Sequence, residues 1–171
     1  INAGVPISKP SYLVNQVCGS GLRAVISGFQ SIKLGDVKNV ISVGQENMSI
    51  SHHSIFYRDE KKIYDDKFID TMVYEGLTDA FNNYLMGVTA ENVAKKFGIS
   101  RQEQDEFALN SQKKTEEAIN NNKFNDELIK INQDGNLLDQ DEHPRIGLKM
   151  LDLEKLKTVF KKDGTVTPGN S

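Results

Sequence analysis

The sequence has a single cysteine, no long apolar run and no large excess of charge of one sign. One cysteine cannot form an internal disulfide, which favours a reducing, cytoplasmic setting. No apolar stretch approaches the roughly 18 residues of a membrane helix, so we expect no membrane span. The 21 basic and 24 acidic residues are mixed along the chain. We therefore expect neither nucleic acid nor an anionic membrane as a partner.

The remaining composition is that of a globular protein. The chain has 171 residues, of which 37% are hydrophobic and 26% are charged, which is enough for one ordinary domain with a core. Its first residues lack an initiating Met and the features of a signal peptide. Residues 164–171 begin like a turn and a strand and then stop. We interpret the sequence as a piece of a longer protein.

The first third has the pattern of a β-α-β unit. Residues 11–17 are rich in β-branched and aromatic side chains, which predicts a short buried strand. In residues 20–34 the apolar side chains recur at steps of three and four, which predicts a helix that ends at Gly35. Residues 40–43 form the second predicted strand. The predicted fold class is α/β, with a right-handed crossover between parallel strands.

After Met48 the pattern of the sequence changes. An irregular, charged excursion loop comes first, and a helix over residues 89–97 ends at Gly98. Ser100 and Glu103 form a capping box that opens a longer helix to about residue 120. Apolar and charged residues alternate over residues 127–131, and Asp134-Gly135 follows as a turn, which predicts a small hairpin or strand pair. Helical spacing over residues 151–160 predicts a last helix, followed by a turn at Asp163-Gly164.

Cys18 lies between the first predicted strand and the first predicted helix, followed by Gly19 and Gly21. The first N–H groups of a helix have no intrahelical partner, and the helix dipole adds positive charge there, so a thiolate is stabilised relative to a thiol. The glycines allow strained dihedrals and the close approach of a substrate. The N–H of Cys18 could then bind a thioester oxygen in an oxyanion hole. The alternative is an ordinary buried cysteine that packs as a small apolar side chain.

The residues around Cys18 resemble the nucleophile motif of the thiolase family. Residues 15–25 read Asn-Gln-Val-Cys-Gly-Ser-Gly-Leu-Arg-Ala-Val, and residues 44–49 resemble a second family segment, although Val43 and Gln45 depart from it. Residues 76–81, 86–94 and 164–167 continue the likeness in family order, over essentially the whole chain. The resemblance implies part of the N-terminal half of a thiolase fold. Residues 1–48 would belong to its α/β domain, and residues 49–171 would form the loop domain, with an oligomerisation loop near residues 49–68, and the start of the return into the core.

The resemblance also implies a reaction. Cys18 would take an acyl group from one coenzyme A thioester, and a second acetyl-CoA would attack the acyl-enzyme; the reverse reaction cleaves 3-ketoacyl-CoA. Coenzyme A thioesters would be substrates, with no permanently bound cofactor. A homo-oligomer, dimer or tetramer, is implied as well. One cysteine and scattered histidines do not give zinc-ligand spacing, so we expect no metal site.

Three positions correspond to family contacts with coenzyme A. Leu77 and Met86 match apolar contacts with the pantetheine arm, and Lys157 matches a basic position near the nucleotide end. Leu85 departs from the pattern, because many relatives have histidine there. For Leu77 and Met86 the alternative is packing within the loop domain, and for Lys157 it is an ordinary solvated lysine.

Several functional alternatives stay open. The family's Asn-Glu-Ala-Phe, Gly-His-Pro and Cys-Gly-Gly-Gly segments are absent from this sequence, so the chain alone is predicted to be catalytically incomplete. We assign no catalytic role to its three histidines, which are His52, His53 and His143. The short-chain reaction on acetyl-CoA is the main interpretation, and a longer-chain 3-ketoacyl-CoA thiolase is the near alternative. A ketoacyl synthase is disfavoured by the residues around Cys18, which are Asn15-Gln16 before it and Gly19-Ser20-Gly21 after it.

Overall fold

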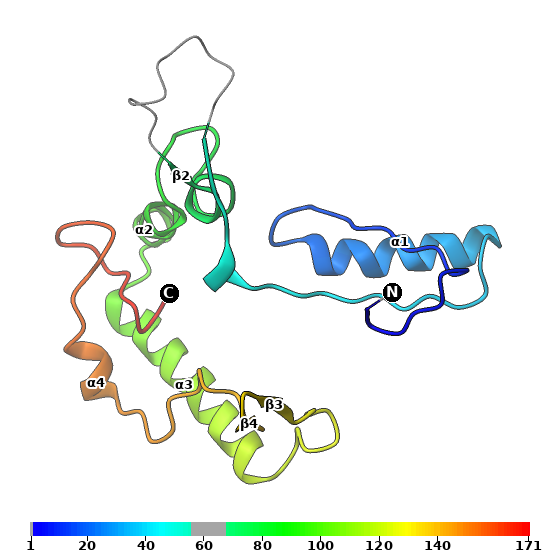
Figure 1. Ribbon diagram of the computed structural model, residues 1–171. Coiled ribbons are helices and arrows are strands. Elements are labelled where there is room, and N and C mark those ends of the chain that lie inside the picture. Colours follow the sequence, from blue (N-terminus) through cyan, green and yellow to red (C-terminus); the bar gives the residue numbers. More distant parts are fainter. Residues whose placement is uncertain (1, 56–67) are drawn as a thin grey trace. The chain divides into compact units, whose positions relative to one another are not determined.

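The computed structural model describes residues 2–55 and 68–171 (Figure 1). The chain divides into two compact units. The first unit is Ile1–Thr78 and the second is Asp79–Ser171. The predicted domain boundary after residue 48 stays a prediction. Among the helices of the described ranges, none combines the length and the hydropathy that crossing a membrane requires.

The first predicted helix is confirmed as α1, Ser20–Leu34, and it ends at Gly35 in the left-handed conformation with φ 79°. An extended segment follows and runs alongside this helix (Figure 1). The Ser42 hydroxyl donates to the Ala24 carbonyl over 3.1 Å. Gly28 is the one residue of α1 that is buried, and a Cβ there would come within 2.8 Å of Val40 Cγ1. The helix and the extended segment are therefore in close contact at a glycine.

The two strands predicted beside α1 are not formed, and those predictions were wrong. Residues 11–17 and 40–43 are not assigned to strands, apart from an isolated bridge between Gln16 and Cys18. The β-propensity of these segments is real, but a strand exists only when a neighbouring strand completes its hydrogen bonds. Within the described residues the two sheets are formed by other parts of the chain.

The remainder of the first unit contains short elements. The 3₁₀ turn η1, Met48–Ile50, leads to β1, His53–Ser54, which pairs antiparallel with β2, Ile69–Asp70. Asp70 Oδ1 then accepts hydrogen bonds from the N–H groups of Met72 and Val73, where the π-helix η3, Met72–Gly76, begins. Of the predicted excursion and oligomerisation loop at 49–68, residues 56–67 lie outside the described residues.

The second unit begins with two helices whose ends carry the predicted signals. α2, Met86–Phe97, starts three residues earlier than expected and ends at Gly98 with φ 67°. α3, Arg101–Asn120, has the predicted capping box, because the Ser100 hydroxyl accepts from the Glu103 N–H and the Glu103 carboxylate accepts from the Ser100 N–H. Local chemistry therefore sets these helix ends.

The predicted hairpin is confirmed, although it starts later than the sequence indicates. β3, Ile131–Gln133, pairs antiparallel with β4, Asn136–Leu138. Asp134 and Gly135 both have positive φ, 52° and 88°, which is the geometry that a two-residue hairpin turn requires. Residues 127–130 are not part of the strand.

The last predicted helix is mostly wrong. α4 covers only Met150–Glu154, whereas the sequence predicts helix to residue 160. Beyond α4 the Val159 N–H donates to the Val166 carbonyl over 3.3 Å. The ring of Phe160 lies so close to Gly87 that a Cβ there would overlap it. These distant contacts take the place of the helical hydrogen bonds that the spacing predicts.

The core of the second unit mixes apolar and polar side chains. Its buried apolar residues come from α2, α3, α4 and the C-terminal segment, residues 164–171, and they are Ala94, Leu109, Leu153 and Val166. Glu91, Asp105 and Thr167 are equally buried. Buried carboxylates require hydrogen-bond partners, and these partners connect the C-terminal segment to the helices.

Candidate active site

Four hydrogen bonds define the turn that carries Cys18. The Gly19 N–H donates to the Gln16 carbonyl over 2.9 Å, and the Ser20 N–H donates to the Val17 carbonyl over 3.1 Å. The Ser20 hydroxyl accepts from the Gln16 N–H over 2.8 Å and donates to the Val17 carbonyl over 2.7 Å. The first residue of α1 therefore closes the turn in front of its own helix.

The strained residue of this turn is Val17, whose φ is +49°. A β-branched residue rarely adopts a left-handed conformation, and such strain persists where surrounding contacts enforce it. The Val17 N–H also donates to Asn15 Oδ1 over 3.0 Å. Gly19, expected to supply the unusual dihedrals, has an ordinary φ of −85°. That expectation was wrong, because the strain falls on the residue before Cys18 and not on the one after it.

Cys18 itself is exposed and immediately precedes Gly19, the N-cap of α1. The thiol is therefore accessible to a substrate, unlike a cysteine that packs in a core. The hydrogen bonds of the turn use the N–H groups of its neighbours, and the Cys18 N–H has no partner within the described residues. An exposed thiol beside an available N–H can bind and attack a carbonyl group.

The three expected coenzyme A contacts lie on different elements. Leu77 follows η3 in the first unit and is 41% exposed. Met86 is the first residue of α2, also 41% exposed, and Lys157 is exposed in the segment after α4. Within the second unit, the contact between Phe160 and Gly87 brings the segment of Lys157 to the start of α2, where Met86 lies.

Glu91 connects α2 to the C-terminal segment. Its Oε1 accepts from the N–H groups of Thr165 and Val166, each over 2.8 Å. Its Oε2 accepts from the Thr165 N–H over 2.9 Å and from the Thr165 hydroxyl over 3.1 Å. Desolvation raises the pKa of Glu91, but the Val166 and Thr165 N–H groups lower it by more, so the pKa lies below its ordinary value.

Asp105 is the second buried carboxylate, on α3. It accepts from Arg101 Nε over 2.7 Å and from Asn170 Nδ2 over 2.8 Å. Arg101 Nη2 in turn donates to the carbonyls of Leu153 and Leu156 over 2.6 and 3.1 Å. Asp105 and its partners therefore join α3, α4 and the C-terminal segment through fully hydrogen-bonded charges.

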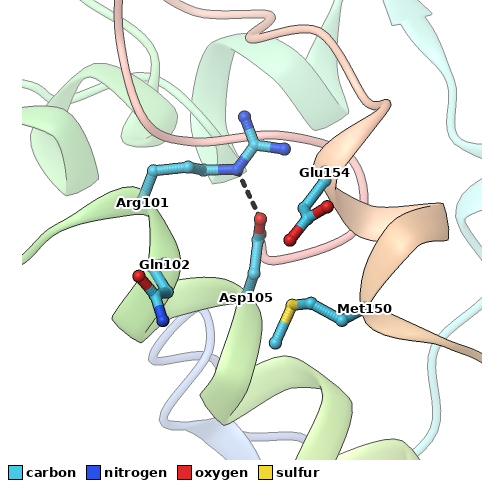
Figure 2. Close-up of a pocket in the computed structure, with 5 residues that line it drawn as sticks. All are labelled: Arg101, Gln102, Asp105, Met150 and Glu154. Atoms are coloured by element: carbon cyan, nitrogen blue, oxygen red, sulfur yellow. Dashed lines mark hydrogen bonds and ion pairs between the residues drawn. The ribbon is translucent and has the colours of Figure 1, made fainter.

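Figure 2 shows an open pocket between α3 and α4, next to this ion pair. Its lining residues are Arg101, Gln102, Asp105, Met150 and Glu154. The guanidinium that borders the pocket already binds Asp105 and two backbone carbonyls. None of the expected site residues lines it. We therefore regard the pocket as part of the packing between α3 and α4 and not as a substrate site.

Sequence reasoning missed both buried carboxylates, because a charged residue on a helix is usually solvated. The available signal was helical position. Glu91 is three residues before the buried Ala94, and Asp105 is four residues before the buried Leu109, so each carboxylate lies on the inward face of its helix. Among residues 2–55 and 68–171, no three His, Cys, Asp or Glu side chains are grouped as metal ligands would be.

The comparison with protein families shows to which family the chain belongs. The family described as "Thiolase, N-terminal domain" matches residues 1–171, the whole of this sequence. This chain belongs to the thiolase family. The resemblance seen around Cys18 is thereby confirmed at the level of the family, and the α/β fold class is that of thiolases.

Individual relatives agree with this assignment. The thiolase chain is 47% identical over 175 residues to an acetyl-CoA acetyltransferase of Rhizobium meliloti, a match that covers 100% of this chain and 44% of the relative. It is 45% identical to an acetyl-CoA acetyltransferase of Paracoccus denitrificans, again over 100% of this chain and 45% of the relative. The chain thus spans less than half the length of these relatives.

Solved structures give the same answer for the fold. The Bacillus anthracis acetyl-CoA acetyltransferase superposes with a TM-score of 0.89 at 35% identity, over 99% of this chain and 44% of that one. Human mitochondrial 3-ketoacyl-CoA thiolase, solved in complex with CoA, superposes with a TM-score of 0.85 at 35% identity, over 97% of this chain and 42% of that one.

Proposed function

We propose that this chain carries the nucleophile of an acetyl-CoA acetyltransferase, which condenses two acetyl-CoA molecules to acetoacetyl-CoA and CoA or catalyses the reverse thiolysis. The observation that carries the proposal is the exposed Cys18 on a strained turn directly before α1, in a chain that matches the thiolase N-terminal domain throughout. The names of the R. meliloti and P. denitrificans relatives favour acetyl-CoA as the substrate.

The proposed reaction begins with the Cys18 thiolate. Its sulfur attacks the thioester carbonyl carbon of acetyl-CoA, and the Cys18 N–H donates to the oxygen that becomes negatively charged. The C–S bond to CoA then breaks, the CoA thiolate leaves and takes up a proton, and Cys18 holds the acetyl group. A second acetyl-CoA loses a proton from its methyl group, and the carbanion attacks the acetyl carbon. Acetoacetyl-CoA forms and the Cys18 thiolate is released.

The proton transfers require groups that we do not assign in this chain. The three histidines, His52, His53 and His143, lie outside the Cys18 turn in the sequence, and none belongs to the family's Gly-His-Pro segment. A 171-residue chain that is acylated but completes no turnover is therefore the second candidate function. Acetoacetyl-CoA thiolysis by the purified chain alone would exclude it.

The binding of coenzyme A is proposed for three residues. Leu77 and Met86 would contact the pantetheine arm with their partly exposed apolar side chains, and the exposed Lys157 would lie near the nucleotide phosphates. No permanently bound cofactor is part of the proposal. A homo-oligomer in the cytoplasm, dimeric or tetrameric, is the proposed context.

A longer-chain 3-ketoacyl-CoA thiolase is the third candidate, supported by the likeness to the human mitochondrial enzyme. Relative rates with acetoacetyl-CoA and with a 3-ketoacyl-CoA of about ten carbons separate the two, because a pocket discriminates about 10- to 200-fold per methylene group. A higher kcat/KM for the longer substrate would reject the acetyl-CoA assignment.

The main test is turnover by the full-length protein and its Cys18→Ala variant. We expect thiolysis of acetoacetyl-CoA by the wild type and a loss of about 10⁴-fold or more in kcat without the nucleophile. Ser31→Ala is the matched control, since Ser31 is on the same helix and its hydroxyl makes no hydrogen bond within the described residues. Equal rates for wild type and Cys18→Ala would refute the proposal.

A further inference from the structure

The buried carboxylate of Glu91 has no part in the proposed reaction, yet it is only 5% exposed and accepts four hydrogen bonds from the C-terminal segment. A charged group is tolerated in such a place only when its partners replace water. Three of its four hydrogen bonds come from backbone N–H groups. The contact therefore fixes the course of the main chain at Thr165 and Val166, and not only a side chain.

The fixed main chain leads directly to the proposed coenzyme A contacts. The Val166 carbonyl accepts from the Val159 N–H, so residues 159–166 form a closed turn that Glu91 attaches to α2. The next residue, Phe160, places its ring on Gly87. Lys157 is two residues before Val159, and Met86 is the residue before Gly87. Glu91 therefore joins the helix that begins with Met86 to the turn that begins two residues after Lys157.

Two glycines show how tightly the segments meet. A Cβ on Gly164 would overlap Glu91 Oε1, and a Cβ on Gly87 would overlap the ring of Phe160. The segment that contains Phe160 and Gly164 therefore packs closely against α2 at two points, Gly87 and Glu91. Glu91 and Met86 are five residues apart on α2, about 7.5 Å along its axis, so a shift of the turn at Glu91 would be transmitted to the start of the helix.

We propose that Glu91 is a positioning residue for acyl-CoA binding: it holds the turn of residues 159–166 on α2 and so sets the distance between Met86 and Lys157. This inference rests on the proposed function. Glu91 does not touch the reacting atoms, and its loss changes the geometry of the binding surface while Cys18 is left as it is. The expected signature is weaker substrate binding with an unchanged chemical step.

The test compares steady-state kinetics of the full-length protein with those of Glu91→Gln. Glutamine has the same shape, but its NH₂ group must face an N–H of Thr165 or Val166, and two donors repel each other. We expect KM for acetoacetyl-CoA to rise about tenfold while kcat stays within about twofold. Amide exchange at Thr165 and Val166, followed by mass spectrometry, is expected to become faster in the variant.

Two further variants make the test specific. Gly164→Ala disturbs the same contact from the other side, and we expect the same rise in KM. Leu109→Ala removes a buried side chain of α3 and lowers stability without touching the turn, so its KM is expected to equal that of the wild type. A KM within about twofold of the wild type for Glu91→Gln, or an equal rise for Leu109→Ala, overturns the inference.

The remaining outcomes are also decisive. If Glu91→Gln does not fold, Gly164→Ala takes its place, and if that fails as well, Thr165→Val does. This variant keeps both backbone N–H donors and removes the hydroxyl, which donates to Glu91 and accepts from Gln104 Nε2, so it is expected to raise KM about two- to threefold. An unchanged KM in the variant that folds overturns the inference. Absence of turnover in the wild type refutes the proposed function instead, so the two failures are distinguishable.

Discussion

The turn at Cys18 and the packing around α3 are stabilised in opposite ways. The turn closes on itself through residues no more than four positions apart, and its side chains are exposed. Around α3, Arg101 reaches a carbonyl 52 residues away and Glu91 reaches an N–H 74 residues away. Local hydrogen bonds form with little help from the rest of the chain, whereas long-range ones exist only when the surrounding structure is complete. The comparison predicts that substitutions destabilise the second region more.

The largest expected effect is that of Leu153→Ala. Leu153 is 2% exposed, so its truncation leaves a cavity and is expected to lower the free energy of unfolding by about 3–4 kcal/mol. Leu22→Ala is the matched variant on α1, where the side chain is 69% exposed, and we expect about 0.5 kcal/mol or less. Urea denaturation of the 171-residue chain measures both. Equal losses of unfolding free energy in the two variants would contradict the comparison and show that the side chain of Leu22 is buried in solution.

Arg101→Met is expected to cost about 3 kcal/mol, because it leaves the carboxylate of Asp105, which is 1% exposed, without its charged partner. The carbonyls of Leu153 and Leu156 lose their donor as well. Glu106→Gln, an exposed position on the same helix, is the control and is expected to be neutral within about 0.5 kcal/mol. A loss below about 1 kcal/mol for Arg101→Met would show that the pair is solvated.

The pH dependence of stability tests the contribution of Glu91 to the long-range contacts of the second region. Its pKa is lowered in the folded protein, below the ordinary value of 4.5, so the ionised form stabilises the fold above that pH and the contribution is lost as the pH falls through the folded-state pKa. Wild type and Glu91→Gln are therefore expected to differ most near neutral pH and to converge below pH 4.5. Thermal unfolding from pH 7 to pH 3 measures this difference; a constant difference would contradict it.

The smallest expected effect is at a helix end that depends on local chemistry. Ser100→Ala removes the hydroxyl that accepts from the Glu103 N–H over 3.2 Å, and we expect a loss of about 1 kcal/mol. Ser111→Ala in the middle of α3 provides the reference for the same substitution. Chemical denaturation monitored by circular dichroism compares the two variants. A loss of about 3 kcal/mol for Ser100→Ala would contradict the expectation that the cap acts only locally.

The features that the sequence predicts correctly are those with local causes. Gly35 and Gly98 end their helices in the left-handed conformation, and the capping box of Ser100 and Glu103 opens α3. The turn of the hairpin follows from Asp134 and Gly135 in the same way. Each signal acts within a few residues, so no knowledge of the rest of the fold is needed.

Two of the errors involve contacts between distant residues. Residues 40–43 have strand propensity but no strand beside them, and the helical spacing after Glu154 yields to the contacts of Val159 and Phe160. The strain at Val17 has a local cause, hydrogen bonds to Asn15 and Ser20, but composition and periodicity do not show how these bonds combine in one turn. For the site, the sequence predicts that Cys18 lies directly before a helix. The role of Glu91 cannot be predicted in this way, because its partners Thr165 and Val166 are 74 and 75 residues away in the sequence.

The central claim is that Cys18 accepts the acyl group, and the most direct measurement is the mass of its proteolytic peptide after the full-length protein has been incubated with acetyl-CoA and quenched in acid. We predict that this peptide gains one acetyl group, that added CoA removes it again, and that Cys18→Ala gains none. An unmodified Cys18 peptide, or acetylation that persists in Cys18→Ala at another residue, would contradict the account.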